Sequence, residues 1–349
     1  MSFSEKILLW YAENKRTLPW RTTRDPYKIW LSEVILQQTR VVQGTPYYLK
    51  FIEHFPTVHD LATAHEDQVL KLWQGLGYYS RARNLHAAAK TVVDQFGGHF
   101  PESYTELLTL KGVGDYTASA ISSICFNEPR AVVDGNVYRV LARYFGVDMP
   151  INTSPGMAYF KQLATEVMDP GNIRDYNQGI MEFGALQCAP KKPYCLLCPL
   201  CESCVALSDN RVAQLPVKLG KTKITKRYFN YMVPLDTSGG TIMQQRKEKG
   251  IWRNLWEFPL LESEGGLSLD KVKSLLSQVF PQTLPVKQVY AFNQEPLVHK
   301  LSHQHLYTRF WIVRVEGIIR DSLALEQVEQ LAVPVLIADF IKALKNSYF

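Results

Sequence analysis

The sequence predicts two domains, an all-α domain that ends in a cysteine-rich loop and an α+β domain that follows it. Three observations predict this organisation. Residues 7–186 show repeated helical periods of apolar side chains. Five of the six cysteines lie between Cys188 and Cys204. Beyond residue 226, short apolar runs that alternate with polar residues are typical of strands, and helical periods separate them.

Composition sets the limits of this prediction. A chain of 349 residues is long enough for two cores, and 46% hydrophobic with 21% charged residues is typical of a globular protein. A net charge of +6 permits a polyanionic partner. No apolar run reaches the roughly 18 residues of a membrane span, and the N-terminus has no signal-peptide pattern. We therefore expect a cytoplasmic protein with no membrane partner, a monomer by default, whose crowded cysteines bind a metal.

The chain is organised around a glycine turn between two helical patterns. Leu110-Lys111-Gly112-Val113-Gly114 closes the pattern of Tyr104–Leu110 and opens that of Thr117–Cys125. Glycines let the backbone turn tightly, and the free amides at a helix start suit a phosphate group. An ordinary turn between helices is the alternative.

Asp134 argues against that alternative. It follows the apolar run Ala131–Val133 and precedes Gly135, as the N-cap of a new helix would. Helix amides favour the charged form of a carboxyl that accepts them, so we expect an anion at neutral pH. An ionised acid near a phosphate-binding turn suggests chemistry at a nucleic-acid sugar.

Leu-x-Gly-Val-Gly-x-x-Thr-Ala followed by Val-Asp-Gly-Asn-Val resembles the helix-hairpin-helix DNA glycosylases, which include endonuclease III. Within that superfamily the chain resembles the MutY-type adenine DNA glycosylases, which remove adenine mispaired with 8-oxoguanine. The resemblance runs from Trp10 to Cys204 and more thinly to the C-terminus. It implies that the partner is double-stranded DNA with A:8-oxoguanine or A:G mispairs, in the nucleoid, and that Gly112, Val113 and Gly114 contact phosphate.

A predicted helix over Tyr27–Thr39 carries the first acid of the site. Its apolar stripe faces a core, whereas Glu33 lies on the other side, where a solvated glutamate is the alternative. The helix is poor in charge, and a closed pocket would raise the pKa of Glu33 enough to hold a proton. Glutamate before Leu-Gln-Gln-Thr is similar to the catalytic glutamate of the family. The resemblance also places these neighbours at the DNA or the adenine pocket: Arg16, Trp20, Arg21, Gln37, Gln38 and Thr39.

Tyr116 indicates the subclass. Endonuclease III-like enzymes carry a lysine here, which attacks the sugar and cuts the strand through a Schiff base. Tyrosine cannot form that imine, so the chain resembles a monofunctional glycosylase; simple packing of the ring is the alternative. Lys111 and Asp115 depart from the commoner residues of the motif, and an acid at a phosphate-facing turn is expected to weaken DNA binding slightly.

The resemblance implies a mechanism for these residues. Glu33 protonates adenine N7, and the anionic Asp134 stabilises the oxocarbenium ion, with a transient covalent adduct as an open alternative. Tyr116 and Asn136 position the sugar and a water, which the deprotonated Glu33 activates.

A second glycine turn, Trp73 to Leu85, carries Gly77, Tyr78, Arg81 and Arg83. A helix-breaking turn over packed aromatic rings is the alternative reading. An aromatic ring on such a turn can wedge between bases while arginines meet phosphates. Tyr78 matches the wedge of the family, and we expect Gly77 to join it at the DNA.

Cys188, Cys195, Cys198 and Cys204 have six, two and five residues between them. Such spacing indicates one four-thiolate site, which zinc or an iron-sulfur cluster would satisfy. The spacing is similar to the [4Fe-4S] loop of the superfamily, so the cluster is expected. Cys201 offers an alternative evenly spaced quartet with the last three of these, but we predict that it is not a ligand.

From residue 206 to residue 226 the apolar period is lost and lysines accumulate, which predicts a basic linker over 207–226. With the resemblance, this divides the chain into a catalytic domain over residues 1–206 with its cluster loop over 188–204, the linker and a Nudix-like domain over 227–349. In the last domain we expect four strands and two helices, at Tyr228–Leu235, Thr241–Gln245, Val286–Phe292, Tyr307–Val315, Leu269–Val279 and Val335–Leu344.

The segment Trp252–Pro259 resembles part of the Nudix fold, but the acid-rich, metal-binding helix does not follow it. We therefore expect recognition of 8-oxoguanine and no nucleotide hydrolysis. Leu301-Ser302-His303 stands where the family has Phe-Ser-His, so Ser302 and His303 are expected to contact the lesion. A turn with exposed histidines is the equally weighted alternative.

Two other functions stay open. A thymine-mismatch glycosylase of the same fold can also carry tyrosine at the place of Tyr116. The hairpin and the cysteines alone would suit a DNA-binding or redox-sensing protein without catalysis. Glu33 and Asp134 argue against the latter, because phosphate binding gains nothing from two acids.

Overall fold

The computed structural model describes residues 1–220, 223–280 and 285–348. Residues 221 and 222 of the predicted linker, residues 281–284 and residue 349 lie outside the described residues. The chain forms two compact units, Met1–Thr63 with Asn84–Gly220 and Ala64–Arg83 with Lys221–Phe349. Ala64–Arg83 thus packs with the C-terminal residues, although the sequence analysis placed it in the helical domain. The predicted domain limits stay a prediction.

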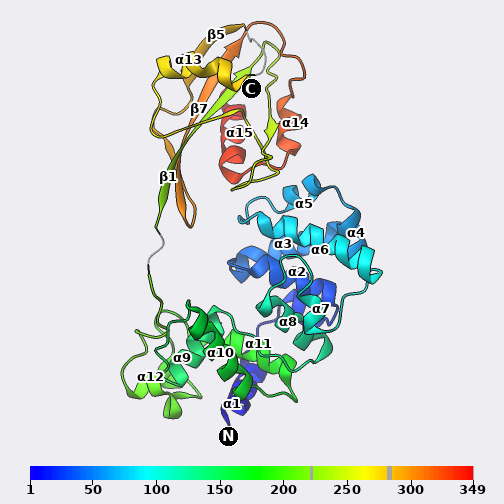
Figure 1. The fold of residues 1–349 in the computed structure, drawn as a ribbon, viewed down its shortest axis with the longest axis vertical. Helices are drawn as coiled ribbons and strands as arrows, with labels where there is room; N and C mark the ends of the chain where they lie inside the picture. Colours follow the sequence, from blue (N-terminus) through cyan, green and yellow to red (C-terminus); the bar gives the residue numbers. More distant parts are fainter. Residues whose placement is uncertain (221–222, 281–284, 349) are drawn as a thin grey trace. The chain divides into compact units, whose positions relative to one another are not determined.

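The first unit is all-α, as predicted, and Figure 1 labels its helices. Its elements, three of them short 3-10 turns, are α1 (Phe3–Asn14), η1 (Pro19–Thr22), α2 (Pro26–Leu36), α3 (Val41–His54), α4 (Val58–Thr63), α6 (Ser80–Phe96), α7 (Tyr104–Leu107), α8 (Asp115–Phe126), α9 (Gly135–Tyr144), α10 (Ser154–Val167), α11 (Ile173–Leu186), η2 (Cys195–Leu197), η3 (Cys201–Ser203) and α12 (Val205–Ser208). The first residues of α6, up to Arg83, belong to the second unit.

Several helix ends differ from the prediction. The helix expected to reach Thr39 ends at Leu36, because Gln38 adopts a φ of 56° and turns the chain. The pattern of Tyr104–Leu110 forms the short α7, followed by tighter i to i+3 bonds such as Leu110 N to Leu107 O, 3.1 Å. Helix α8 begins at Asp115, since Gly114 is its N-cap.

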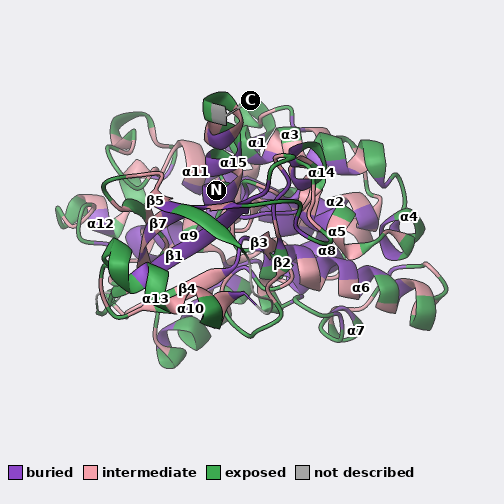
Figure 2. Cartoon of the chain, turned by 90° about the horizontal axis from the view of Figure 1, so that it is seen from above, coloured by how far each residue is buried: buried purple, intermediate pink, exposed green. Residues whose placement is uncertain are grey.

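Helix α8 lies at the centre of this unit. Its residues from Thr117 to Ile124 are all buried, which the burial colours of Figure 2 let the reader follow. Helix α8 packs against α2 and α11, and α11 packs against α1 and α9. These contacts bring together the ends of helices that are far apart in the sequence, and a cavity opens where they meet.

Part of the predicted linker packs with the helical unit. The Arg143 Nε donates to the Leu215 carbonyl (3.1 Å), and the Ile151 amide donates to the Val217 carbonyl (3.0 Å). The chain up to Gly220 is therefore part of the helical unit.

The second unit is an α+β structure, as predicted. Besides Ala64–Arg83 with α5 (Glu66–Leu72), it contains β1 (Thr225–Leu235), β2 (Gln244–Gln245), β3 (Trp256–Glu257), β4 (Leu260–Ser263), α13 (Leu269–Val279), β5 (Val286–Ala291), β6 (Leu297–Lys300), β7 (Gln304–Val315), α14 (Leu325–Gln330) and α15 (Val335–Tyr348). The main sheet has the order β4-β1-β7-β5, and β6 also pairs with β7. Of the strand pairs in the described residues, β1 and β7 alone are parallel, with Tyr231 opposite Phe310.

The central strand β7 has a helix on each face. Trp311 and Val313 belong to one apolar cluster with Val272 of α13. Phe310, which points to the opposite face, stacks on Phe340 of α15 with 3.8 Å between ring centroids. The alternating sequence of β7 therefore fixes which helix covers which face.

Predictions for this unit were right for the long elements and incomplete for the short ones. The strand expected over Thr241–Gln245 is reduced to Gln244–Gln245, with an isolated bridge between Thr241 and Leu323. Strands β3, β4 and β6 and helix α14 were not predicted, because two to six residues give too little periodicity. No helix among the described residues is long and apolar enough to cross a membrane.

Candidate active site

A cavity of about 500 Å³ opens in the helical unit, at the ends of α2, α8, α9 and α11. Ten of the predicted site residues line it. They are Arg16, Trp20, Arg21, Glu33, Gln37, Gln38, Thr39, Tyr116, Asp134 and Asn136. Residues separated by up to 120 positions in the sequence thus meet in one place, which helical periodicity by itself could not show.

Glu33 and Tyr116 form a hydrogen-bonded pair in this cavity. The Tyr116 hydroxyl donates to Glu33 Oε2 (2.7 Å) and contacts Met181 Sδ (3.3 Å). Burial raises the pKa of Glu33 to about 7, helped by the nearby charge of Asp134 and opposed by the Tyr116 hydrogen bond. Glu33 is therefore a carboxyl that can hold a proton near neutral pH and face a ligand in the cavity.

Asp134 caps helix α9, as predicted. Its Oδ1 accepts from the amides of Asn136 (2.9 Å) and Val137 (2.8 Å), and its Oδ2 accepts from Asn136 Nδ2 (2.7 Å). Burial nevertheless raises the pKa of Asp134, and these hydrogen bonds only oppose the shift. The prediction that the helix start would favour the charged form was wrong in the net direction, because desolvation is the larger effect.

A chain of hydrogen bonds links Asp134 to the cysteine loop. Asn136, which donates to Asp134, accepts from Arg139 Nη2 (2.8 Å). The same guanidinium donates to the Cys188 carbonyl (2.8 Å) and the Gly184 carbonyl (2.5 Å). Arg139 is buried, so these contacts fix Asn136 from behind.

Glu182 is a residue of the cavity that the sequence analysis missed. Its buried carboxylate receives paired hydrogen bonds from Arg16 (2.7 and 2.6 Å) and from Arg21 (2.9 and 2.8 Å). Burial by itself would raise the pKa of Glu182, but the arginine hydrogen bonds outweigh it and hold the pKa at about 2. An acid between Ile180 and Phe183, on a helix face that is otherwise apolar, was the signal that could have found it.

The glutamines after α2 lie at the mouth of the cavity. Gln37 Nε2 donates to Thr117 Oγ1 (3.3 Å), so Gln37 is tied to α8. Gln38 is exposed, and its φ of 56° is the turn that ends the helix. Thr39 lines the cavity beside them.

The hairpin has the geometry that its glycines predict. Gly112 has a φ of 80°, and a Cβ there would come within 2.7 Å of Asn84 Cβ. Gly114 is the N-cap of α8 and provides no side-chain hydrogen bond to the first amides of that helix. Space around Gly114 is open, and Val113 is buried beneath the turn. Uncapped amides at an open helix start are suited to a phosphate.

In the second unit, the turn of Gly77 and Tyr78 lines another cavity, of about 580 Å³, together with Trp252, Ser302 and His303. The hydroxyls of Tyr78 and Ser302 are hydrogen-bonded to each other. Tyr78 is half-exposed with a φ of 46°, whereas Ser302 and His303 are exposed in the turn between β6 and β7. Residues expected at the wedge and at the lesion thus meet in this cavity.

The two arginines of this turn differ in how far they fit their predicted role. Arg81 is buried, stacks over the Trp73 ring (5.0 Å) and donates to the carbonyls of Leu76 and Gly77 (both 3.3 Å). Arg83 donates to the Arg253 carbonyl (2.8 Å). Arg81 therefore braces the turn from inside, whereas Arg83 ties it to the chain at Arg253 and lines the cavity, so a phosphate contact stays a prediction for Arg83.

The five clustered cysteines, Cys188, Cys195, Cys198, Cys201 and Cys204, line one small cavity of about 30 Å³. Arg143 Nη1 donates to Cys188 Sγ (3.4 Å) and to the Ala189 carbonyl (2.9 Å). Within the described ranges, no group of three or more His, Cys, Asp or Glu side chains is arranged to hold a metal ion. A donor set made only of thiols, with a guanidinium beside it, fits a thiolate-bound iron-sulfur group in its chemistry.

Comparison with known proteins defines the class first. A family model described as "HhH-GPD superfamily base excision DNA repair protein" matches residues 31–165, and a model described as "NUDIX domain" matches residues 230–343. The helical unit is also similar to a thermostable thymine-DNA glycosylase, with a TM-score of 0.55 and 32% identity over 59% of this chain and 95% of that one. Endonuclease III in a non-covalent DNA complex shares the fold, at 21% identity over 59% of this chain and 94% of that one, with a TM-score of 0.52.

The adenine DNA glycosylase of Buchnera aphidicola subsp. Baizongia pistaciae (strain Bp) is 35% identical over 317 residues, which are 89% of this chain and 86% of that protein. The adenine DNA glycosylase of Homo sapiens is 32% identical over 370 residues, 90% of this chain and 67% of that protein. The chain therefore belongs to the adenine DNA glycosylase family and is a DNA N-glycosylase.

Proposed function

We propose that this protein excises adenine from A:8-oxoguanine and A:G mispairs in double-stranded DNA, acting as a monomer at the nucleoid. The observation that carries the proposal is the cavity that holds Glu33, with its pKa raised to about 7, and the carboxyl of Asp134 together. Family membership supports adenine as the base. A base in this cavity has left the DNA stack, since such a pocket cannot be reached inside a duplex.

In the proposed reaction Glu33 gives its proton to adenine N7. The electron pair of the glycosidic bond then leaves with the base, and positive charge develops on the sugar. Asp134, held by Asn136 and Val137, stabilises that charge. A water positioned by Tyr116 and Asn136 adds to the sugar carbon and returns a proton to Glu33. Tyr116 offers no amine, so strand cleavage through an imine is not part of the reaction.

Arg16 and Arg21 give the cavity a role in recognising the base. Arg16 and Arg21 both bind Glu182, so a fixed array of donors and acceptors lies beside the Trp20 ring. A polar array next to an aromatic ring suits the edge and the face of a planar base. We propose that this array selects adenine.

We propose that Ser302, His303 and Tyr78 receive the opposite base in the cavity of the second unit. Their common lining of one cavity and the Tyr78 to Ser302 hydrogen bond support this. A base in this cavity would contact the polar groups of Ser302 and the ring of Tyr78. Compared with guanine, 8-oxoguanine has an additional oxygen at C8 and a proton at N7, and polar groups in the cavity can distinguish the two bases by hydrogen-bonding to these atoms.

We also propose that Cys188, Cys195, Cys198 and Cys204 hold a [4Fe-4S] cluster. When bound, such a cluster cross-links the loop and leaves no open metal position for a substrate. Arg143 and Arg139 bind the same loop from the helical side. The protein's own residues carry every step at the sugar.

The test is base release from labelled duplexes with A:8-oxoguanine, A:G, A:T and T:G pairs, each read with and without alkali. We expect strand cleavage only after alkali and only with the first two. Cleavage without alkali would contradict the role of Tyr116. Similarity to a thymine-DNA glycosylase makes T:G the most informative alternative, and release from T:G alone would assign the protein to that activity.

A further inference from the structure

Asp115 is an acid in an unfavourable place. It is the first residue of α8, directly after Gly112, Val113 and Gly114 of the hairpin, and it is exposed. The amides at this helix start are not capped by Gly114, and under the proposed function they bind a DNA phosphate. A free carboxylate at this position would repel that phosphate.

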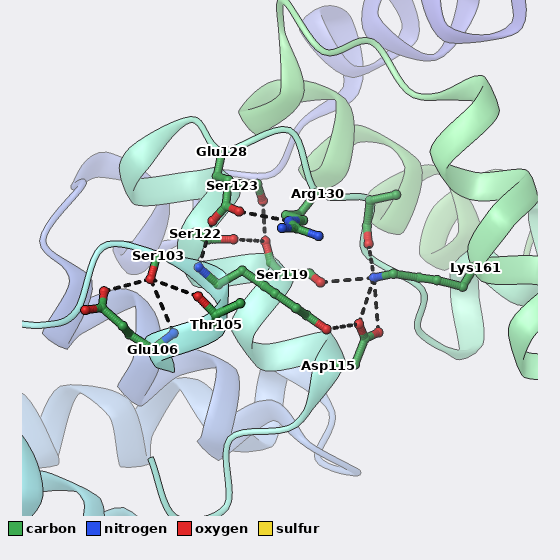
Figure 3. A network of polar contacts seen from close by, with 12 residues as sticks. Ser103, Thr105, Glu106, Asp115, Ser119, Ser122, Ser123, Glu128, Arg130 and Lys161 are labelled. Carbon is green, nitrogen blue, oxygen red and sulfur yellow. Dashed lines mark hydrogen bonds and ion pairs between the residues drawn. The ribbon is translucent and has the colours of Figure 1, made fainter. Parts of the chain in front are cut away.

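Two other side chains bind this carboxylate. Lys161 Nζ, from α10, is 3.0 Å from Asp115 Oδ1 and 3.1 Å from Oδ2, and the Tyr104 hydroxyl donates to Oδ1 (2.8 Å). Figure 3 shows the Lys161 ammonium facing the Asp115 carboxylate across the start of α8. The charge of the acid is therefore balanced within the protein by a residue from another helix.

Lys161 is held in place by more than this ion pair. Its ammonium also donates to Ser119 Oγ (3.0 Å) and to the Ala131 carbonyl (2.7 Å), as Figure 3 shows for Ser119. Three acceptors use all three N–H groups of a lysine. Such an ammonium is fixed in position, unlike a surface lysine that samples many rotamers and pairs only weakly.

We propose that Lys161 and Tyr104 are positioning residues that hold and neutralise the Asp115 carboxylate, and so keep the amides of the hairpin available to a DNA phosphate. This inference rests on the proposed function, in which the hairpin binds DNA. Neither residue touches the substrate in this account. Both act through Asp115, so removing the acid removes the need for them.

The experiment measures the Kd of the full-length protein for an undamaged labelled duplex over a range of salt concentrations. Lys161→Met and Tyr104→Phe are compared with the same changes in an Asp115→Asn background. Lys50→Met, an exposed lysine of α3, controls for the loss of one positive charge. We expect Lys161→Met to weaken binding by about three- to tenfold at low salt, and Tyr104→Phe less, from the strength of an uncompensated charge near a phosphate.

In the Asp115→Asn background both changes are expected to lose their effect, with Kd within about twofold of Asp115→Asn alone, because the charge that they balance is gone. If Lys161→Met weakens binding equally in both backgrounds, the lysine acts by tying Ala131 to α8 or by direct phosphate contact, and the proposal is wrong. Should Lys161→Met not fold, the Tyr104 pair decides in the same way.

The excision rate separates this proposal from the proposed function. At saturating Tyr104→Phe enzyme, the single-turnover release of adenine should equal that of the wild type, because only the DNA-binding step is affected. A wild-type protein that releases no adenine would contradict the proposed function. If the wild type releases adenine normally but Lys161→Met and Tyr104→Phe still weaken binding in the Asp115→Asn background, only the role of Lys161 and Tyr104 is contradicted.

Discussion

Glu33 combines two properties that usually exclude each other, a buried carboxyl and a site open to a ligand. Most of its neighbours on α2 are buried apolar residues, and the Tyr116 hydroxyl donates a hydrogen bond to it. Burial disfavours the charged form, which is how a glutamate becomes a proton donor near neutral pH. The same burial lowers the free energy of unfolding once Glu33 ionises, because a buried charge is poorly solvated.

Glu33→Gln tests this loss of stability. The pKa of Glu33 is raised from 4.5 to about 7, so the folded state binds its proton more tightly than the unfolded chain does. The stability that this proton gives is complete below pH 4.5 and is lost as pH rises through about 7. We expect Glu33→Gln to have a higher Tm than the wild type at pH 8 and an equal Tm at pH 4, while base release falls on the order of 10²- to 10⁴-fold. An equal Tm at both pH values would mean that Glu33 is solvated.

Tyr116→Phe tests the partner. The Tyr116 hydrogen bond lowers the pKa of Glu33 against the effect of burial, so its loss raises that pKa further. The alkaline limb of the pH profile of single-turnover release is therefore expected to move to higher pH, because the general acid stays protonated longer. A limb that moves to lower pH would show that the hydroxyl stabilises the protonated carboxyl.

Helix α11 sets the position of the acid on α9. Gly184 faces Asn136, and a Cβ on Gly184 would come within 2.7 Å of Asn136 Cβ and 2.9 Å of its carbonyl oxygen. Asn136 donates to Asp134, so a shift of the backbone here moves the Asp134 carboxyl.

Gly184→Ala is expected to lower stability by about 1–3 kcal/mol through overpacking, and to lower base release by a larger factor than DNA binding. Denaturant unfolding and single-turnover kinetics measure the two effects. Gly171→Ala is the matched control, since a Cβ there approaches nothing closer than 3.4 Å. Equal losses of binding and release would show that the glycine serves only the fold.

The cysteine loop, like the helices, is a structural element whose role can be tested. Cys201 lines the small cavity with the four predicted ligands, so its position does not exclude it as a ligand. The spacing of the family favours the other four cysteines, so we expect Cys201→Ser to keep the absorbance at about 400 nm of a thiolate-bound cluster, which Cys198→Ser should lose. Loss of that band in Cys201→Ser would make Cys201 a ligand.

In the whole chain, the segment Ala64–Arg83 joins the C-terminal residues instead of the helical unit. Lys71 Nζ donates to the carbonyls of Glu329 (2.7 Å) and Leu331 (3.0 Å), and Asn254 and Gln245 bind Glu66 and Asp67 of the same segment. Tyr78 thus belongs to the same unit as Ser302, and these polar contacts attach its segment to that unit.

Lys71→Met should loosen this attachment. Amide hydrogen exchange is expected to become faster over residues 66–83, because the segment loses its hydrogen bonds to the carbonyls at the end of α14 and opens more often. Lys90→Met, an exposed lysine later in α6, is the control and should leave these amides unchanged. Unchanged exchange in Lys71→Met would mean that the Lys71 hydrogen bonds do not hold the segment.

Resemblance to the family supplied most residues of the central cavity, but the sequence by itself determined the order of the long helices and strands, the cysteine loop and the positions of Glu33 and Asp134 as candidate acids. It could do so because the glycines, the acids and the cysteines carry their chemistry in local patterns: a hairpin, an N-cap and a fixed spacing. Only the tertiary structure decided that Glu182 binds Arg16 and Arg21, that Arg81 is internal, and that Lys161 balances Asp115. Partners of buried charges come from distant helices, and burial reversed the direction expected for the pKa of Asp134, because desolvation depends on everything that packs around a group and not on its neighbours in the chain.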